Sequence, residues 1–141
     1  MKQKAIIVDI DGTVAIRDDE LRDPFATEFD KLVADTPHSR IVDLVALMFN
    51  SDYKVIYVTG RDGRAEEGTR EWLRLYAPPY AHLYMRTPND MRKDTIVKRE
   101  IYETKIEPHY DVHYVLDDRN QVVDMWREIG LVCLQVAPGD F

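Results

Sequence analysis

Short apolar runs rich in branched and aromatic residues alternate along the chain with stretches whose apolar residues recur every three or four positions. The runs predict five strands: Ala5–Val8, Lys54–Val58, Ala81–Met85, Val112–Leu116 and Leu131–Val136. Each run is mostly apolar throughout or rich in Val, Ile and Tyr, which is typical of strands buried on both faces. We therefore expect these strands to form a buried parallel sheet.

The segments between the predicted strands have helical periodicity. They predict helices around Ile41–Met48, Trp72–Tyr76, Ile96–Ile101 and Val122–Ile129. Thr36-Pro37 offers a cap and a first-turn proline for the first of these helices, and Gly130 offers a left-handed stop for the last. The alternation of strands and helices predicts an α/β, doubly wound five-stranded parallel sheet, whose ligands bind beyond the carboxyl ends of the strands.

Carboxylates follow two of the predicted strands at that edge. Asp9 and Asp11 come directly after the first strand, and Asp117 and Asp118 end the fourth. Burying charges next to an apolar strand costs several kcal/mol unless a cation compensates them. Mg²⁺ prefers such hard oxygen ligands and usually keeps several waters. The sequence therefore predicts a Mg²⁺ site at Asp9, Asp11, Asp117 and Asp118, and it leaves open which of the last two touches the ion.

Groups that can bind phosphate follow the second and third predicted strands. Thr59, Gly60 and Arg61 place a hydroxyl, a backbone amide and a guanidinium where the second strand ends. Hydroxyl and amide donors bind phosphate oxygens, and arginine pairs with them bidentately. Lys93 follows the third strand and opens the third helix, where positive charge and helix amides favour an anion. Together these residues predict a phosphate site beside the carboxylates.

The order Asp-x-Asp-Gly-Thr, Thr-Gly-Arg, Lys and Asp-Asp, each after a successive strand, resembles the haloacid dehalogenase (HAD) superfamily of phosphoryl-transfer enzymes. Residues 89–98, 115–127 and 135–141 are similar to the 3'-phosphatase domain of phage-type polynucleotide kinase/phosphatases. This similarity runs over nearly the whole chain from Ala5. The family joins that domain to an amino-terminal P-loop kinase. The 141 residues contain no Gly-x-x-x-x-Gly-Lys-Ser/Thr stretch, so 5'-kinase activity is not carried over.

The resemblance implies a covalent route to phosphate hydrolysis. Asp9 would be the nucleophile that forms an aspartyl phosphate, with Mg²⁺ screening the two anions from each other. Asp11 would be the acid and base that protonates the departing alcohol and then activates water. Its carbonyl, rather than its carboxylate, is the metal ligand expected from that residue. Thr59 and Lys93, with the main-chain amides near Asp11 and Gly60, would hold the phosphoryl oxygens in the transition state.

The resemblance also implies arginines that bind substrate. Arg61 and one arginine in the segment after the first motif would grip the terminal phosphate or the adjacent nucleotide. Arg22 is the preferred candidate for the second arginine, and Arg17 is the alternative.

Two residues flank the predicted lysine of the site. We expect Asp90 to orient Lys93 or Arg61 through an ion pair, and Lys98, more than a turn into the helix, to lie on the surface.

Composition limits the class of protein. The 141 residues are 45% hydrophobic and suit one domain over 1–141. The net charge of −7 argues against a protein that coats nucleic acid or an anionic membrane. Residues 61–105 nevertheless hold a slight excess of basic over acidic residues, as expected for an enzyme that contacts a few phosphates. A single cysteine, and no apolar run of membrane length, predict a cytoplasmic location without membrane contact.

The spacing between motifs leaves no room for a cap domain over the site. Residues 14–52 and 62–90 connect successive motifs, and predicted helices and a strand occupy much of both stretches. Many HAD enzymes for small metabolites use such a lid. An uncovered site suits a phosphate at the end of a polymer.

The sequence therefore predicts a Mg²⁺-dependent, capless HAD phosphatase that removes 3'-phosphates from DNA or RNA ends, with 2',3'-cyclic phosphates as a second class of end to consider. The resemblance implies repair of cleaved tRNA or nicked DNA before ligation, with a separate kinase or ligase as partner. One alternative is the same chemistry on small phosphomonoesters or nucleotides. Another is a non-enzymatic phosphate- or metal-binding module that partners a kinase or ligase.

Overall fold

The computed structural model describes residues 1–16 and 35–141. Its main sheet has five strands in the order β5-β4-β1-β6-β7, and every neighbouring pair is parallel. The strands are β1 (Gln3–Val8), β4 (Lys54–Asp62), β5 (His82–Arg86), β6 (Tyr110–Asp117) and β7 (Cys133–Gln135). The predicted α/β sheet and its five strands are confirmed.

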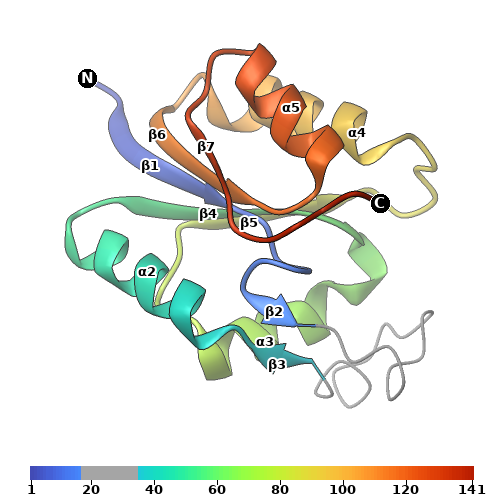
Figure 1. The fold of residues 1–141 in the computed structure, drawn as a ribbon. Helices are drawn as coiled ribbons and strands as arrows, with labels where there is room; N and C mark the ends of the chain where they lie inside the picture. Colours follow the sequence, from blue (N-terminus) through green and yellow to red (C-terminus); the bar gives the residue numbers. More distant parts are fainter. Residues whose placement is uncertain (17–34) are drawn as a thin grey trace.

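Helices cover both faces of this sheet (Figure 1). On one face lie α2 (Ser39–Asn50) and α3 (Glu66–Tyr76), the latter preceded by a 3-10 turn, η1 (Gly63–Ala65). On the other lie α4 (Asp94–Ile101), its π-helical extension η2 (Tyr102–Ile106) and α5 (Asn120–Glu128). Among the described residues, no helix combines the length and the hydropathy that a membrane span requires.

The central strand explains why the apolar runs are continuous. Ile6 and Val8 of β1 belong to the core under α2 and α3, whereas Ala5 and Ile7 belong to the core under α4 and α5. Because side chains alternate along a strand, both faces of β1 need apolar residues. The helices supply large partners, including the fully buried Trp72 and Trp126.

A second, two-stranded sheet overturns one predicted helix cap. β2 (Ala15–Ile16) pairs antiparallel with β3 (Thr36–Pro37), so these two residues form a strand and not the start of a helix. α2 begins after His38, whose side chain makes no capping hydrogen bond and whose backbone N–H donates to the Val14 carbonyl at 2.7 Å.

The described parts of both inter-motif connections hold this small sheet, the helices α2 and α3, the turn η1 and the main-sheet strand β5. They contain no cap domain. The left-handed stop predicted at Gly130 is confirmed, since its φ is +93° and the chain leaves α5 there toward β7.

Candidate active site

Three carboxylates converge beyond the carboxyl ends of β1 and β6. The two strands are neighbours, with Val8 opposite Leu116, so the residues that follow them meet at one edge. Carboxylate oxygens of Asp9, Asp117 and Asp118 all lie within 4.8 Å of one another, and all three residues are buried. The structure thus brings together the two predicted acidic motifs.

A buried lysine bridges this cluster, and it is not the lysine expected from the sequence. Lys98 Nζ donates to Asp9 Oδ1 at 2.9 Å and to Asp117 Oδ2 at 3.0 Å, and the residue is 3% exposed. The prediction that Lys98 lies on the surface is therefore wrong. Lys93 instead lies exposed at the start of α4. Lys98 shares the inward face of α4 with Val97 and Ile101, and this helical spacing is the signal that could have identified it.

Burial and crowding shift the proton affinities of the cluster. Burial raises the pKa of Asp9 well above its usual range; Lys98 opposes this shift and Asp117 adds to it. Burial likewise raises the pKa of Asp118. Burial alone would lower the pKa of Lys98, but Asp9 and Asp117 more than compensate and raise it. Lys98 is therefore a cation, and one lysine offsets only part of the charge of three close carboxylates.

Hydrogen bonds distinguish the two adjacent aspartates. Asp117 accepts from Lys98, from the Trp126 indole at 3.2 Å and from the Asp118 backbone N–H at 2.9 Å. The Asp118 carboxylate lies against Gly12, where a Cβ atom would come 2.1 Å from Oδ2. Gly12 also has a φ of +82°, which other residues rarely adopt. The glycine of the first motif thus makes room for the Asp118 carboxylate.

The remaining oxygen of Asp9 is also held. Thr13 Oγ1 donates to Asp9 Oδ2 at 3.1 Å, and Thr13 is completely buried. This contact gives the Thr of the Asp-x-Asp-Gly-Thr motif a role in fixing the orientation of Asp9.

The second aspartate of the motif faces a different partner. Arg61 donates through Nε to Asp11 Oδ2 at 2.9 Å and through Nη2 to Asp11 Oδ1 at 2.7 Å. The same guanidinium donates to Asp35 Oδ2 at 3.0 Å and to Thr69 Oγ1 at 3.1 Å. The predicted acid/base is therefore gripped bidentately by the arginine that the sequence assigns to phosphate. Sequence reasoning missed Asp35 because no periodic or motif signal surrounds it.

The loop after β5 is organised by arginines. Arg86 donates from Nε to the Gly60 carbonyl at 3.0 Å and from Nη1 to the Asp90 carbonyl at 3.0 Å, and it also pairs with Asp94. The Asp90 carboxylate binds Arg92 at 2.8 Å, which holds the pKa of Asp90 at about 2. The expectation that Asp90 orients Lys93 or Arg61 is therefore wrong.

Thr59 and Gly60 lie in β4 beside this loop. Thr59 is buried, and its Oγ1 accepts from the Arg61 backbone N–H at 3.1 Å. The carboxylate of Asp94 packs so closely on Gly60 that a Cβ atom there would lie 2.5 Å from Oδ1. The candidates Arg17 and Arg22 lie outside the described residues.

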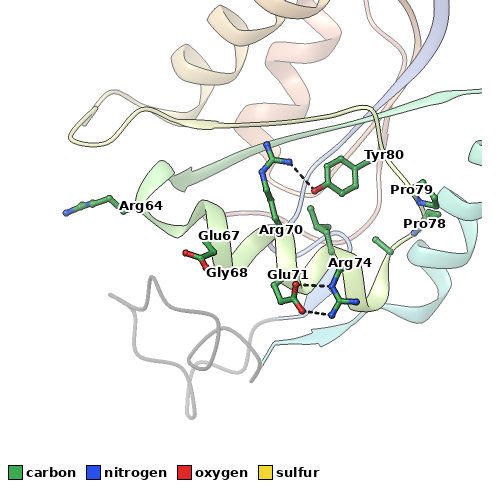
Figure 2. Close-up of a pocket in the computed structure, with 11 residues that line it drawn as sticks. Arg64, Glu67, Gly68, Arg70, Glu71, Arg74, Pro78, Pro79 and Tyr80 are labelled. Atoms are coloured by element: carbon green, nitrogen blue, oxygen red, sulfur yellow. Dashed lines mark hydrogen bonds and ion pairs between the residues drawn. The ribbon is translucent and has the colours of Figure 1, made fainter.

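A hollow on the outer side of α3 is separate from this centre (Figure 2). Arg70 points across it to the Tyr80 hydroxyl at 3.2 Å, and Arg74 pairs with Glu71 on the same helix. None of the site residues predicted from the sequence lines this hollow. This hollow therefore contains no part of the predicted site.

Comparison with known proteins identifies the family. The family model for the polynucleotide kinase PNKP phosphatase domain matches residues 3–141. The chain belongs to this family. The PNKP phosphatase domain described here is 31% identical over 131 residues to a protein of Autographa californica nuclear polyhedrosis virus named as a putative bifunctional polynucleotide kinase/RNA ligase. That match covers 91% of the chain and 18% of the viral protein.

Solved structures agree on the fold of this PNKP phosphatase domain. A chain in the structure of the Pnkp1/Rnl/Hen1 RNA repair complex matches with a TM-score of 0.90 and 40% identity, covering 99% of this chain and 44% of that one. A D,D-heptose 1,7-bisphosphate phosphatase from B. bronchiseptica, solved with magnesium and phosphate, matches with a TM-score of 0.63 and 17% identity over 94% and 79% of the two chains. The domain thus spans less than half of the viral relative and of the repair-complex chain.

Proposed function

We propose that this domain is a Mg²⁺-dependent polynucleotide 3'-phosphatase that works through an aspartyl phosphate on Asp9. The observation that carries the proposal is the buried cluster of Asp9, Asp117 and Asp118, bridged by Lys98, with Asp11 held beside it by Arg61. This arrangement supplies a nucleophile, a cation and a separate acid/base carboxylate within one edge of the sheet.

The first step is attack by a carboxylate oxygen of Asp9 on the phosphorus of the terminal phosphate. The new oxygen–phosphorus bond forms as the bond from phosphorus to the 3'-oxygen breaks, and Asp11 donates its proton to that departing oxygen. Asp11 then takes a proton from water, which attacks the phosphorus of the acyl phosphate and restores Asp9. Thr13 and Lys98 hold Asp9 in orientation throughout.

The carboxylate cluster fits a divalent cation. Three buried carboxylates, two of them with raised pKa values, provide hard oxygen ligands and an uncompensated demand for positive charge. Asp9 and Asp118, with the carbonyl of Asp11, would hold the ion, while Asp117 positions Lys98. When bound, Mg²⁺ supplies positive charge that lets an anionic nucleophile approach an anionic phosphate.

Lys98 takes the role that the sequence assigned to Lys93. Its ammonium is already beside Asp9, where it can stabilise the oxygens of the transferring phosphoryl group. The hydroxyl of Thr59 and the backbone at Gly60 lie on the neighbouring strand and contribute further donors. All three guanidinium nitrogens of Arg61 donate to protein groups, so Arg61 keeps Asp11 aimed at the departing oxygen, with Asp35 as its positioning partner.

The relatives favour the ends of nucleic acids as substrate. The family is that of polynucleotide kinase phosphatase domains. One similar chain belongs to a structure named as an RNA repair complex, and the viral relative is named as a putative polynucleotide kinase/RNA ligase. The described parts of the connections contain no cap domain, which supports a polymer end as substrate. We propose 3'-phosphates of RNA or DNA and 2',3'-cyclic phosphates of RNA as substrates, and a kinase or ligase as the partner in repair.

A substrate panel tests the proposal. Phosphate release is measured with and without Mg²⁺ from 3'-phosphorylated RNA and DNA oligonucleotides, a 2',3'-cyclic end, a nucleoside 3'-monophosphate and p-nitrophenyl phosphate. We expect Mg²⁺-dependent turnover, highest for the oligonucleotides, and none from Asp9→Asn. Equal or better efficiency on the small esters would replace the polymer substrate with a small-molecule one. Full activity of Asp9→Asn would show that Asp9 is not the nucleophile.

A further inference from the structure

A hollow of about 550 Å³ lies toward the amino ends of the strands, at the opposite edge of the sheet from the carboxylate cluster. Its walls include Gln3 of β1, His82 and Tyr84 of β5, and Tyr110 of β6. The eight residues of β6 run from Tyr110 to Asp117, which corresponds to about 20 Å along a strand. The volume is that of a small-molecule pocket. The hollow is therefore a candidate site remote from the catalytic centre.

Three half-buried aromatic side chains, His82, Tyr84 and Tyr110, form the ring wall of this hollow. His82 and Tyr84 are two positions apart on β5, so their side chains leave the same face of the sheet. Their rings stack, with centroids 5.3 Å apart and planes inclined by 19°. The Tyr110 ring meets His82 edge-on, and its hydroxyl shares a hydrogen bond of 2.9 Å with His82 Nε2. The rings are thus held in place before any ligand binds, which lowers the entropic cost of stacking a planar ligand on them.

Positive charge lines the same hollow and is not neutralised by the protein. Lys105 of η2 and His109 are exposed, and neither side chain forms a hydrogen bond or an ion pair with any described residue. Among the described residues, none of those that line the hollow carries a carboxylate, although the net charge of the chain is −7. An ammonium group without a carboxylate partner, beside further N–H donors, favours an anion such as phosphate.

The backbone that presents Lys105 has an uncommon conformation. In η2 the Glu107 backbone N–H donates to the Tyr102 carbonyl, five residues earlier, at 2.8 Å. Such π-helical segments are rare and are frequently found at functional sites. Here the segment places Thr104 and Lys105 at the hollow while Ile106 remains in the core.

From these contacts we propose that the hollow is a second, non-catalytic site that binds a nucleotide, with its base against the ring wall and its phosphate on Lys105 and His109. The ligand class is a nucleotide because the hollow offers both stacking surface and an unpaired ammonium group. A nucleoside would use only the first of these, and inorganic phosphate only the second. Neither Mg²⁺ nor Asp9 takes part, so this site goes beyond the proposed function and does not depend on it.

Calorimetric titration of the wild-type domain in the presence of a chelator tests the site. The probes are adenosine 5'-monophosphate (AMP), adenosine, inorganic phosphate, and a single-stranded hexa-adenylate that ends in a 3'-hydroxyl. Adenine is the base of choice because purines have a large stacking surface. We expect AMP or the hexa-adenylate to bind at least about tenfold more tightly than adenosine or phosphate. The tighter of the two identifies the source of the nucleotide, free or within a strand.

Two results of this titration would overturn the proposal. One is affinity for inorganic phosphate equal to that for both nucleotide probes, which would leave a general anion site. The other is the absence of saturable binding of either nucleotide probe up to about 1 mM.

Lys105→Glu should weaken binding of the nucleotide about tenfold or more. Lys54→Glu is the matched control, because Lys54 is an exposed lysine at the start of β4 that does not line the hollow. Both lysines are exposed, so neither change should unfold the domain. Tyr84→Leu removes one ring of the wall and should weaken binding of the nucleotide but not of inorganic phosphate. Equal nucleotide affinity in Lys105→Glu and Lys54→Glu would contradict the site.

Amide chemical shifts in NMR spectra locate the ligand independently of affinity. Addition of the nucleotide should shift amides of residues 82–84 and 102–110, whereas shifts confined to the loops after β1 and β6 would place it at the catalytic edge and overturn the proposal. Lys105→Glu should also keep the phosphatase turnover of the wild type, since β6 separates the two edges. A wild-type domain without phosphatase activity would refute the proposed function and leave the calorimetric result standing.

Discussion

Replacing Lys98 by methionine tests the electrostatic core of the site. The substitution keeps most of the length of the side chain and removes the ammonium that bridges Asp9 and Asp117. Both carboxylates are buried, so water cannot replace the lost partner. We expect this single change to affect stability and catalysis together.

The distances set the size of the effect. At 2.9 and 3.0 Å, each ammonium–carboxylate attraction is worth about 6 kcal/mol at an effective dielectric constant of about 20, before desolvation is counted. Removing one partner from a buried ion pair typically costs roughly 3–5 kcal/mol. Lys98→Met should therefore lower the free energy of unfolding by roughly 3–5 kcal/mol when divalent ions are chelated.

Urea denaturation in the presence of a chelator measures this loss of unfolding free energy. When the denaturation is repeated with Mg²⁺, the unfolding free energy should increase more for Lys98→Met than for the wild type. The variant lacks the cation that competes with the ion, so its apparent Mg²⁺ affinity should be higher. Lys98→Met should also lose its phosphatase turnover.

Lys93→Met is the control, because Lys93 is exposed and its removal should change stability by less than about 0.5 kcal/mol. An inactive Lys93→Met beside an active, stable Lys98→Met would refute the assignment.

Two further substitutions probe other parts of the site, and the single cysteine tests the core beside it. Gly12→Ala should weaken Mg²⁺ binding measured by calorimetry, because the added methyl group meets Asp118 at a backbone φ of +82°; wild-type affinity would contradict this. Arg61→Lys should lower kcat about a hundredfold without unfolding the domain, since lysine cannot reproduce the two-pronged grip on Asp11; near-normal turnover would argue against that role. Burial raises the pKa of Cys133 to about 12, so stability from this thiol should be complete below about pH 8.5 and decline as the pH rises toward 12. Ellman's reagent should accordingly react slowly with the folded domain at pH 8 and readily in denaturant, and fast labelling of the folded domain would contradict the burial.

The sheet could be predicted because burial on both faces leaves a strong local signal. A central strand such as β1 must be apolar at every position, and the carboxyl ends of parallel strands must share one edge. The short pairing of Ala15–Ile16 with Thr36–Pro37 could not be predicted this way, since two-residue strands have no periodicity. The proline there satisfied the rule for a helix start equally well.

The position of the site could be predicted, but the prediction of its lysine was wrong for a physical reason. Asp9, Asp117 and Asp118 follow strands directly, so their positions are fixed by the sheet. Whether Lys98 points into the site depends on the rotation of α4 about its axis, which the motif order does not define. Lys93, about one turn earlier, also follows the third strand and so fitted the expected order of motifs equally well. The contact between Asp35 and Arg61 joins residues 26 positions apart, and only tertiary packing determines it.

The central claim is that Asp9 carries the phosphoryl group, and Asp11→Asn with p-nitrophenyl phosphate tests it most directly. Nitrophenolate leaves without a proton, so the variant can be phosphorylated, but it lacks the base that activates water for the second step. Rapid mixing with Mg²⁺ should give a burst of one nitrophenolate per site followed by near arrest, and acid-quenched protein should carry phosphate on Asp9. Steady turnover without a burst, or phosphate on another residue, would contradict the account.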